Sequence, residues 1–193
     1  GFVDAASRRA SVVRRFTVPD IREIYDARLL IEGHALETAM TAGRITSAFI
    51  AQLETIVERQ IDELSRETSE GLGEAIRLDR EFHGLIVNIG GNRLLANWHG
   101  IVLLQTQTIR NYSLSRYALE RVRCEHGEIV AALRGGDAKS SIGALRAHLA
   151  LASASARTAN WRSAPAVSSR WQDRQGCRWS ICARRHDRRS LTS

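Results

Sequence analysis

Apolar residues recur every three or four positions through most of this 193-residue chain, a period that is typical of helices with one buried face. In the segment GLGEAIRLDREFHGLIVNIG, for example, Phe82, Ile86 and Ile89 fall on a single face. No stretch alternates convincingly between apolar and polar residues, as a half-buried strand would. The pattern predicts an all-α fold, an antiparallel bundle of about six helices, at roughly residues 20–42, 46–66, 72–89, 92 onward, 115–133 and 137–156.

Residues that commonly precede helices mark several of these starts. Asp20 is followed three residues later by a glutamate, as in a capping box, and we expect the first helix to begin there. Thr46 or Ser47 can cap the second helix, and Asn92 can cap the fourth. The RGGD sequence ends the fifth helix at its glycines and makes Asp137 the cap of the sixth.

The helical region, expected at residues 20–156, is flanked by two segments of different character. Residues 1–19 lack periodicity, contain two arginine pairs and end in a proline, so we interpret them as a linker. Residues 157–193 hold three of the four tryptophans and two of the three cysteines, again without periodicity. We expect a disordered tail there, or an out-of-frame read. Its Cys177, Cys182 and His186 are too few and too irregularly spaced to predict a zinc site.

The net charge is concentrated in that tail. The whole chain has a formal charge of +7, and residues 157–193 alone contain nine arginines and two aspartates, so the remainder is neutral. The body therefore shows no basic signature of nucleic-acid binding. No run approaches the roughly 18 apolar residues of a membrane span, and the N-terminus does not resemble a signal peptide. Three cysteines form no paired framework, and we expect a cytoplasmic domain with no membrane contact.

Four polar residues interrupt the apolar faces of three predicted helices. Asp79 and His83 lie one turn apart on the third helix, His126 lies on the fifth and His148 on the sixth. One such histidine is usually a satisfied core residue, but four buried polar groups without partners would be costly. A divalent cation would remove that cost, and this pattern predicts a mononuclear metal site. Three nitrogens and one oxygen make zinc the first choice, with nickel, cobalt or manganese as alternatives, and suit calcium poorly.

Two other metal chemistries do not fit the residues. A di-iron site needs Glu-x-x-His sequences on two helices, and none occurs. A thiolate zinc site needs several cysteines, and Cys124 stands alone before the tail. Three further residues on these helices are given structural interpretations. His34 and His99 fall off the clearest apolar faces and are expected at the surface or an interface, whereas Trp98 is expected in the core.

Arg28 and Glu32 lie one turn apart on the first helix, in line with Ile21 and Ala35, so both are expected to face the bundle. One interpretation is that they contact a bound effector, with the guanidinium clamping an acidic group. The alternative is an internal ion pair that fixes the helix.

Three stretches of the chain resemble a known family: DIREIYDARLLIEGHALETA, LDREFHGLIVNIGGNRLL and EHGEIVAALRGGDAKSSIGALRAHL. Over about residues 20–155 they are similar to the FCD (FadR C-terminal) effector-binding domain of GntR-type transcription regulators. The resemblance implies an all-helical sensor that forms a homodimer and holds a metal through one aspartate and three histidines. In this sequence those residues would be Asp79, His83, His126 and His148.

The same resemblance implies a winged-helix DNA-binding domain before the sensor. The opening GFV resembles the last strand of the wing, so residues 1–19 would be the end of the wing and the interdomain linker. Operator DNA would then be bound only through a winged helix that this chain lacks.

A metal with four protein ligands in six-coordinate geometry leaves two positions for a carboxylate with a neighbouring hydroxyl, as in hydroxy acids and sugar acids. The expected function is metal-dependent sensing of a small organic acid, without catalysis. A hydrolase-like enzyme would need a general base beside the metal. Glu81 points away from the ligand face, and Glu125 and Glu128, which flank His126, are not convincing. A purely structural metal is the remaining alternative.

Overall fold

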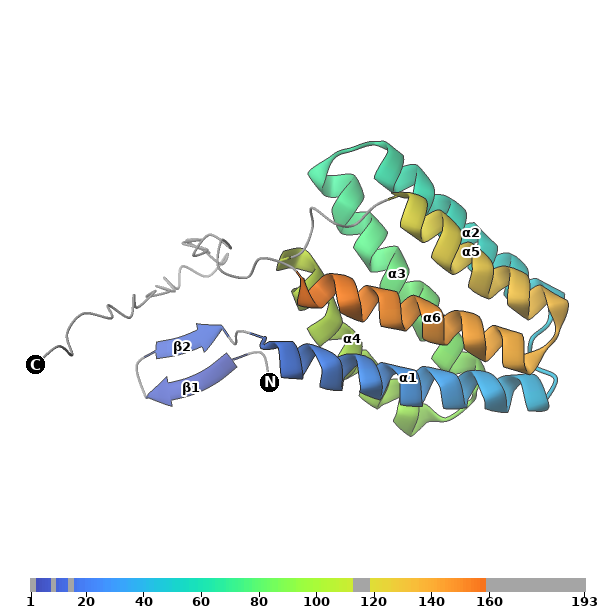
Figure 1. Cartoon of the computed structure of the whole chain (residues 1–193), viewed down its shortest axis with the longest axis horizontal. Coiled ribbons are helices and arrows are strands. Elements are labelled where there is room, and N and C mark those ends of the chain that lie inside the picture. Colours follow the sequence, from blue (N-terminus) through green and yellow to red (C-terminus); the bar gives the residue numbers. More distant parts are fainter. Residues whose placement is uncertain (1–2, 8–9, 14–15, 113–118, 159–193) are drawn as a thin grey trace, which may run out of the picture. The chain divides into compact units, whose positions relative to one another are not determined.

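The computed structural model describes residues 3–7, 10–13, 16–112 and 119–158. The main body, Phe16–Asn160, is one compact unit, and the N-terminal residues belong to another. The described part of the body forms six helices (Figure 1), which confirms the predicted all-α bundle: α1 Val18–Thr41, α2 Ser47–Ser65, α3 Ser69–Ile89, α4 Arg93–Tyr112, α5 Leu119–Gly135 and α6 Ala138–Arg157. The tail prediction for residues 157–193 falls outside the described residues from position 159 onward.

Helix α3 packs against α1, α2 and α4, and α1 packs against α3, α4 and α6. Helix α5 packs against α2 and α6. Neighbours such as α1 and α6, or α2 and α3, run in opposite directions (Figure 1). This arrangement brings side chains that are far apart in the sequence to the middle of the bundle.

Side-chain caps explain where the helices begin. Thr46, Asn92 and Asp137 accept hydrogen bonds from main-chain amides in the first turns of α2, α4 and α6, as the sequence predicts. The prediction for α1 is wrong by one turn. Thr17 is the cap: its Oγ1 accepts from the Asp20 amide at 3.3 Å, and Asp20 Oδ2 accepts from the Thr17 amide at 2.7 Å. Proline is tolerated in the first turn of a helix, so α1 can start before Asp20.

The N-terminal residues form a two-stranded antiparallel hairpin, β1 Val3–Ser7 and β2 Ala10–Val13, with Val3 opposite Val13. The interpretation of residues 1–19 as the end of a wing and a linker does not predict this hairpin. Each strand has only four or five residues, many of them alanine or serine, so no alternation of apolar and polar residues is visible. Main-chain pairing across a short connection does not need that alternation.

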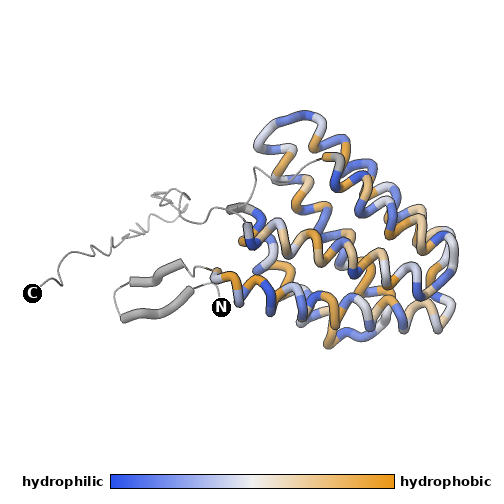
Figure 2. The backbone as a smooth tube through the Cα atoms, in the orientation of Figure 1, coloured by the Kyte–Doolittle hydropathy of each residue, from blue (hydrophilic) through white to orange (hydrophobic). Residues whose placement is uncertain are grey.

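Apolar and polar residues are interspersed along the helices of the body (Figure 2), as expected of helices with one buried face. Helix α4 departs from the expected orientation. Its apolar face is exposed: Trp98 is 51% exposed, so the prediction that it belongs to the core is wrong, and Leu94, Ile101 and Leu104 are exposed as well. Its inner face is largely polar and includes His99, Thr106 and Arg110. An apolar stripe in a sequence identifies a face but does not say what covers it.

Candidate metal centre

The four predicted metal ligands lie together in the bundle. Asp79 and His83 come from α3, His126 from α5 and His148 from α6, and all four side chains are buried. One potential ligand atom from each residue lies within 4.8 Å of those of the other three. The one-turn spacing on α3 puts Asp79 and His83 on the same face, and the packing of the bundle supplies the other two.

The Nδ1 atoms of two of these histidines are held by carboxylates. His83 Nδ1 lies 2.7 Å from Glu32 Oε2, and His148 Nδ1 lies 2.8 Å from Glu125 Oε2. The pKa of Glu125 is lowered to about 2, because hydrogen bonds from His148 and Arg121 outweigh the effect of burial, which would raise it. An ionised carboxylate only accepts, so Nδ1 of each ring must donate. The lone pair of each neutral imidazole is therefore on Nε2.

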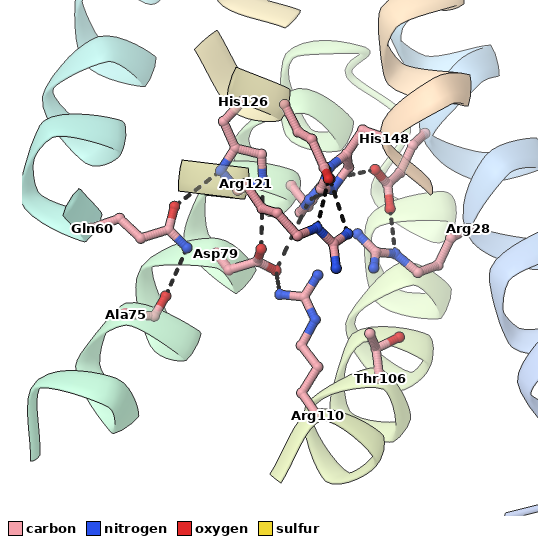
Figure 3. A network of polar contacts seen from close by, with 12 residues as sticks. Arg28, Gln60, Ala75, Asp79, Thr106, Arg110, Arg121, His126 and His148 are labelled. Atoms are coloured by element: carbon pink, nitrogen blue, oxygen red, sulfur yellow. Dashed lines mark hydrogen bonds and ion pairs between the residues drawn. The ribbon is translucent and has the colours of Figure 1, made fainter. Parts of the chain in front are cut away.

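Gln60 is the hydrogen-bond acceptor for Nδ1 of His126, as the two carboxylates are for the other histidines. The Gln60 amide nitrogen donates to the main-chain oxygen of Ala75 at 2.9 Å, which turns its amide oxygen toward His126 Nδ1 at 3.0 Å (Figure 3). His126 Nδ1 is thus the donor, and Nε2 carries the lone pair. Within the described residues, this buried Nε2 makes no hydrogen bond, and it lies 3.5 Å from Asp79 Oδ1.

Three imidazole lone pairs and one carboxylate therefore converge. The Nε2 atoms of His83 and His148 are 3.2 Å apart, and two acceptors at that distance repel each other unless a cation or a proton lies between them. Burial disfavours the proton, since it lowers the pKa of His83 and His148 to about 4 and that of His126 to about 3. Zinc–nitrogen bonds of about 2.0–2.1 Å place neighbouring ligand atoms roughly 2.8–3.4 Å apart, so the separation of these two Nε2 atoms suits two ligands of one divalent metal.

Arg110 supplies the counter-charge of Asp79. Burial by itself would raise the pKa of Asp79, but the guanidinium of Arg110, with further contributions from His83 and His126, holds that pKa well below its usual range. Arg110 Nη1 contacts Asp79 Oδ2, and the arginine is only 9% exposed. Arg110 comes from the last turn of α4, so this contact ties α4 to α3.

Arg28 and Glu32 form the internal ion pair that was one of their two interpretations. Glu32 Oε1 lies 2.8 Å from Arg28 Nε and 2.9 Å from His99 Nε2, so both oxygens of this carboxylate have partners. Arg28 is fully buried, yet its Nη1 and Nη2 make no hydrogen bond within the described residues. Its guanidinium extends toward the polar cluster around Asp79 and His148 (Figure 3).

Sequence reasoning missed several residues that hold the cluster. His99 is expected from the sequence at the surface or an interface, but it is 2% exposed and contacts Glu32 inside the bundle. His34 is exposed, in agreement with the same expectation. Glu125 was considered only as a weak candidate for a general base. Gln60 carried a usable signal, because it lies on the same apolar face of α2 as Leu53 and is completely buried. The pattern that identified the histidines would have identified this glutamine too.

The fold and the cluster define an all-helical domain built around a buried aspartate and three buried histidines. The family model of the FCD domain matches residues 23–151, and the chain belongs to this family. The resemblance noted in the sequence is thereby confirmed.

One relative by sequence is the HTH-type transcriptional regulator YdhC of Bacillus subtilis (strain 168), itself uncharacterized, with 32% identity over 133 residues. The match covers 67% of this chain and 56% of YdhC, so the chain spans little more than half the length of that relative.

Several solved structures share the fold. The metal-free FCD domain of TM0439, described as a transcriptional regulator, has 19% identity and a TM-score of 0.61, with 75% of this chain and 96% of that chain covered. E. coli McbR/YncC has 17% identity and a TM-score of 0.68, with 80% and 72% covered. A GntR-family transcriptional regulator from Pseudomonas syringae pv. tomato str. DC3000 has 19% identity and a TM-score of 0.61, with 81% and 63% covered.

The sequence relative is described as a transcriptional regulator, as are two of these structural neighbours, TM0439 and the Pseudomonas syringae protein. This agrees with the prediction that the chain is not an enzyme. Among the described residues, no helix combines the length and apolar composition needed to cross a membrane.

Proposed function

We propose that this chain is the effector-sensing domain of a DNA-binding transcription regulator, and that it senses a small organic acid through a bound divalent transition metal. Asp79, His83, His126 and His148 would hold the metal, with zinc as the first choice and nickel or manganese as alternatives. The observation that carries the proposal is the convergence of three Nε2 lone pairs whose Nδ1 atoms already have partners. Metal-bound histidines in proteins typically have this kind of support on the other ring nitrogen.

A carboxylate is the ligand class that best suits such a centre. In six-coordinate geometry, four protein ligands leave two positions for a carboxylate and a neighbouring hydroxyl. Arg28 supports the assignment, because its two Nη groups are buried without hydrogen bonds in the described part of the chain. They would clamp a second acidic group of the effector. Glu32 is better assigned to orienting His83 than to binding the effector, since both its oxygens are engaged.

DNA recognition would reside in a winged-helix domain outside these 193 residues. Homodimerisation is also proposed, and the exposed apolar side chains Leu94, Trp98 and Ile101 on one face of α4 support a second copy as the partner of that face. The effector would act by favouring one arrangement of the dimer over another, and a coupling of about 1–3 kcal/mol suffices to change operator affinity several-fold or more.

Metal analysis and ligand titration test this proposal together. Native mass spectrometry of protein purified without chelator should show one divalent transition metal per chain. Calorimetry should then detect binding of malate, a hydroxy acid, that disappears after chelation and returns when zinc is restored. Metal without any malate or other carboxylate binding would favour a structural role for the metal. Malate binding that persists unchanged after chelation would refute metal-dependent sensing.

A further inference from the structure

Charge balance around the cluster restricts the kind of ligand that can bind there. Among the described residues, three ion pairs contact the cluster or its partners: Arg28–Glu32, Arg110–Asp79 and Arg121–Glu125. A histidine binds a metal through the lone pair of its neutral ring, so the three histidines add no charge to a metal-loaded site. These contacting groups therefore sum to zero.

A divalent cation changes that sum to +2 in a buried place. Buried charge is costly unless it is compensated, so the ligand that completes the site should supply two negative charges. A dicarboxylate meets this requirement, and a monocarboxylate compensates only half of the cation. The guanidinium of Arg110 offers positive charge to the second carboxylate, as do the two Nη groups of Arg28, which make no hydrogen bond in the described part of the chain.

Arg110 is placed to make the binding of cation and dianion interdependent. Its guanidinium contacts a carboxylate oxygen of Asp79, so it lies within a few ångströms of any cation that Asp79 ligates. Like charges at that distance repel strongly in a buried site. A dianion that bridges the metal and Arg110 would turn this repulsion into two attractions. Arg110 would thus weaken the binding of the metal alone and strengthen the binding of metal and dianion together.

We propose that Arg110 couples the two binding events, so that the site takes up a divalent metal and a dicarboxylate cooperatively and prefers a dicarboxylate over a monocarboxylate. This inference rests on the proposed function, because it needs a metal at the cluster. Coupling of this kind is reciprocal: the factor by which bound metal raises the affinity for the dianion equals the factor by which bound dianion raises the affinity for the metal.

Malate and lactate are a matched pair of probes, since both carry a hydroxyl next to a carboxylate and only malate has a second carboxylate. The proteins to compare are the wild type, Arg110→Met and Arg77→Met. Arg77 is an exposed arginine of α3 that pairs with Glu74 and Glu81, so its replacement is a control for the loss of one positive charge. Calorimetry would measure zinc binding to chelator-treated protein, and then malate and lactate binding to zinc-loaded protein.

In the wild type, zinc-loaded protein should bind malate at least tenfold more tightly than lactate. Arg110→Met should bind zinc alone at least tenfold more tightly than the wild type, while its preference for malate falls below threefold. Arg77→Met should match the wild type in both measurements. If Arg110→Met binds zinc no more tightly, or keeps the full malate preference, the coupling role of Arg110 is wrong.

The two proposals fail in different ways. A wild type that binds no divalent metal, with or without malate, would refute the proposed function, whatever Arg110→Met does. A wild type that binds zinc and malate, with Arg110→Met indistinguishable from it, would refute only the coupling. If Arg110→Met does not fold, nuclear magnetic resonance of the wild type replaces it, with Arg110→Lys used to assign the Arg110 Nε–Hε signal. That signal should shift on addition of zinc and again with malate, and an unchanged signal would overturn the inference.

Discussion

Replacing Gln60 with methionine keeps His126 but removes the group that orients its imidazole, so it tests the orientation by itself. Gln60 is completely buried, and its amide bridges His126 Nδ1 at 3.0 Å and the Ala75 oxygen at 2.9 Å. Methionine has a similar length but cannot accept from Nδ1–H, so that donor is left buried without its partner. An unsatisfied buried donor costs about 1–3 kcal/mol. In a domain of this size, that loss lowers the melting temperature of chelator-treated protein by roughly 2–10 °C.

The affinity for zinc should respond to this substitution more specifically than the free energy of unfolding does. Without Gln60 the imidazole of His126 can rotate or move its proton to Nε2, and either change removes the lone pair from the centre. Loss of a hydrogen-bond partner behind a metal-bound histidine typically costs about 10–100-fold in metal affinity, or roughly 1.4–2.7 kcal/mol. We therefore expect Gln60→Met to bind zinc about 10–100-fold more weakly than the wild type.

Calorimetric zinc titration of chelator-treated protein measures this effect, with thermal unfolding followed in parallel. Gln52→Met is the matched control, because Gln52 is an exposed glutamine of the same helix. It should change neither zinc affinity nor melting temperature. If Gln60→Met retains wild-type zinc affinity although it is less stable, then Gln60 has no role in orienting His126 or in holding its proton on Nδ1.

Three further predictions concern the ligands, the pH dependence and the assembly. His126→Ala should lose zinc affinity and about 2–5 kcal/mol of stability together. Replacing all four ligands with apolar residues of similar size should leave a chain that folds without metal but binds no malate. Chemical unfolding measures the stability of both variants, and calorimetry measures their zinc and malate binding. The pKa values of the three histidines are lower in the folded chain than the unfolded value near 6.5. The free energy of unfolding of chelator-treated protein should therefore fall by several kcal/mol as the pH is lowered from about 6.5 to 4. Unfolding curves that do not change over this range would contradict the prediction. Trp98→Glu should convert the expected homodimer to a monomer in light scattering, and an exposed position of α2, such as Thr55→Glu, should not.

The four cluster residues could be predicted because each is a polar residue on an otherwise apolar helical face. Their partners were harder to find, because the contacts that hold the histidines join distant parts of the chain. Glu32 and His83 are separated by 51 positions, and Gln60 and His126 by 66. A periodic pattern reports which way one side chain points, but it carries no information about which helix lies opposite. Only the packing of α1 and α2 against α3 and α5 brings these pairs together.

Helix α4 shows the same limit and also suggests how a signal could leave the site. Its sequence has a clear apolar face, but in this fold that face is exposed, while His99 and Arg110 turn inward to Glu32 and Asp79. The inner face is stabilised by hydrogen bonds and charge pairing, which respond to a bound metal or anion. The outer face has the composition of a surface that packs against another molecule. We therefore infer that a ligand which changes the pairing of Arg110 acts on the helix that carries the proposed dimer contact. A shift of about 1–3 kcal/mol between two arrangements of α4 would be enough to carry the response.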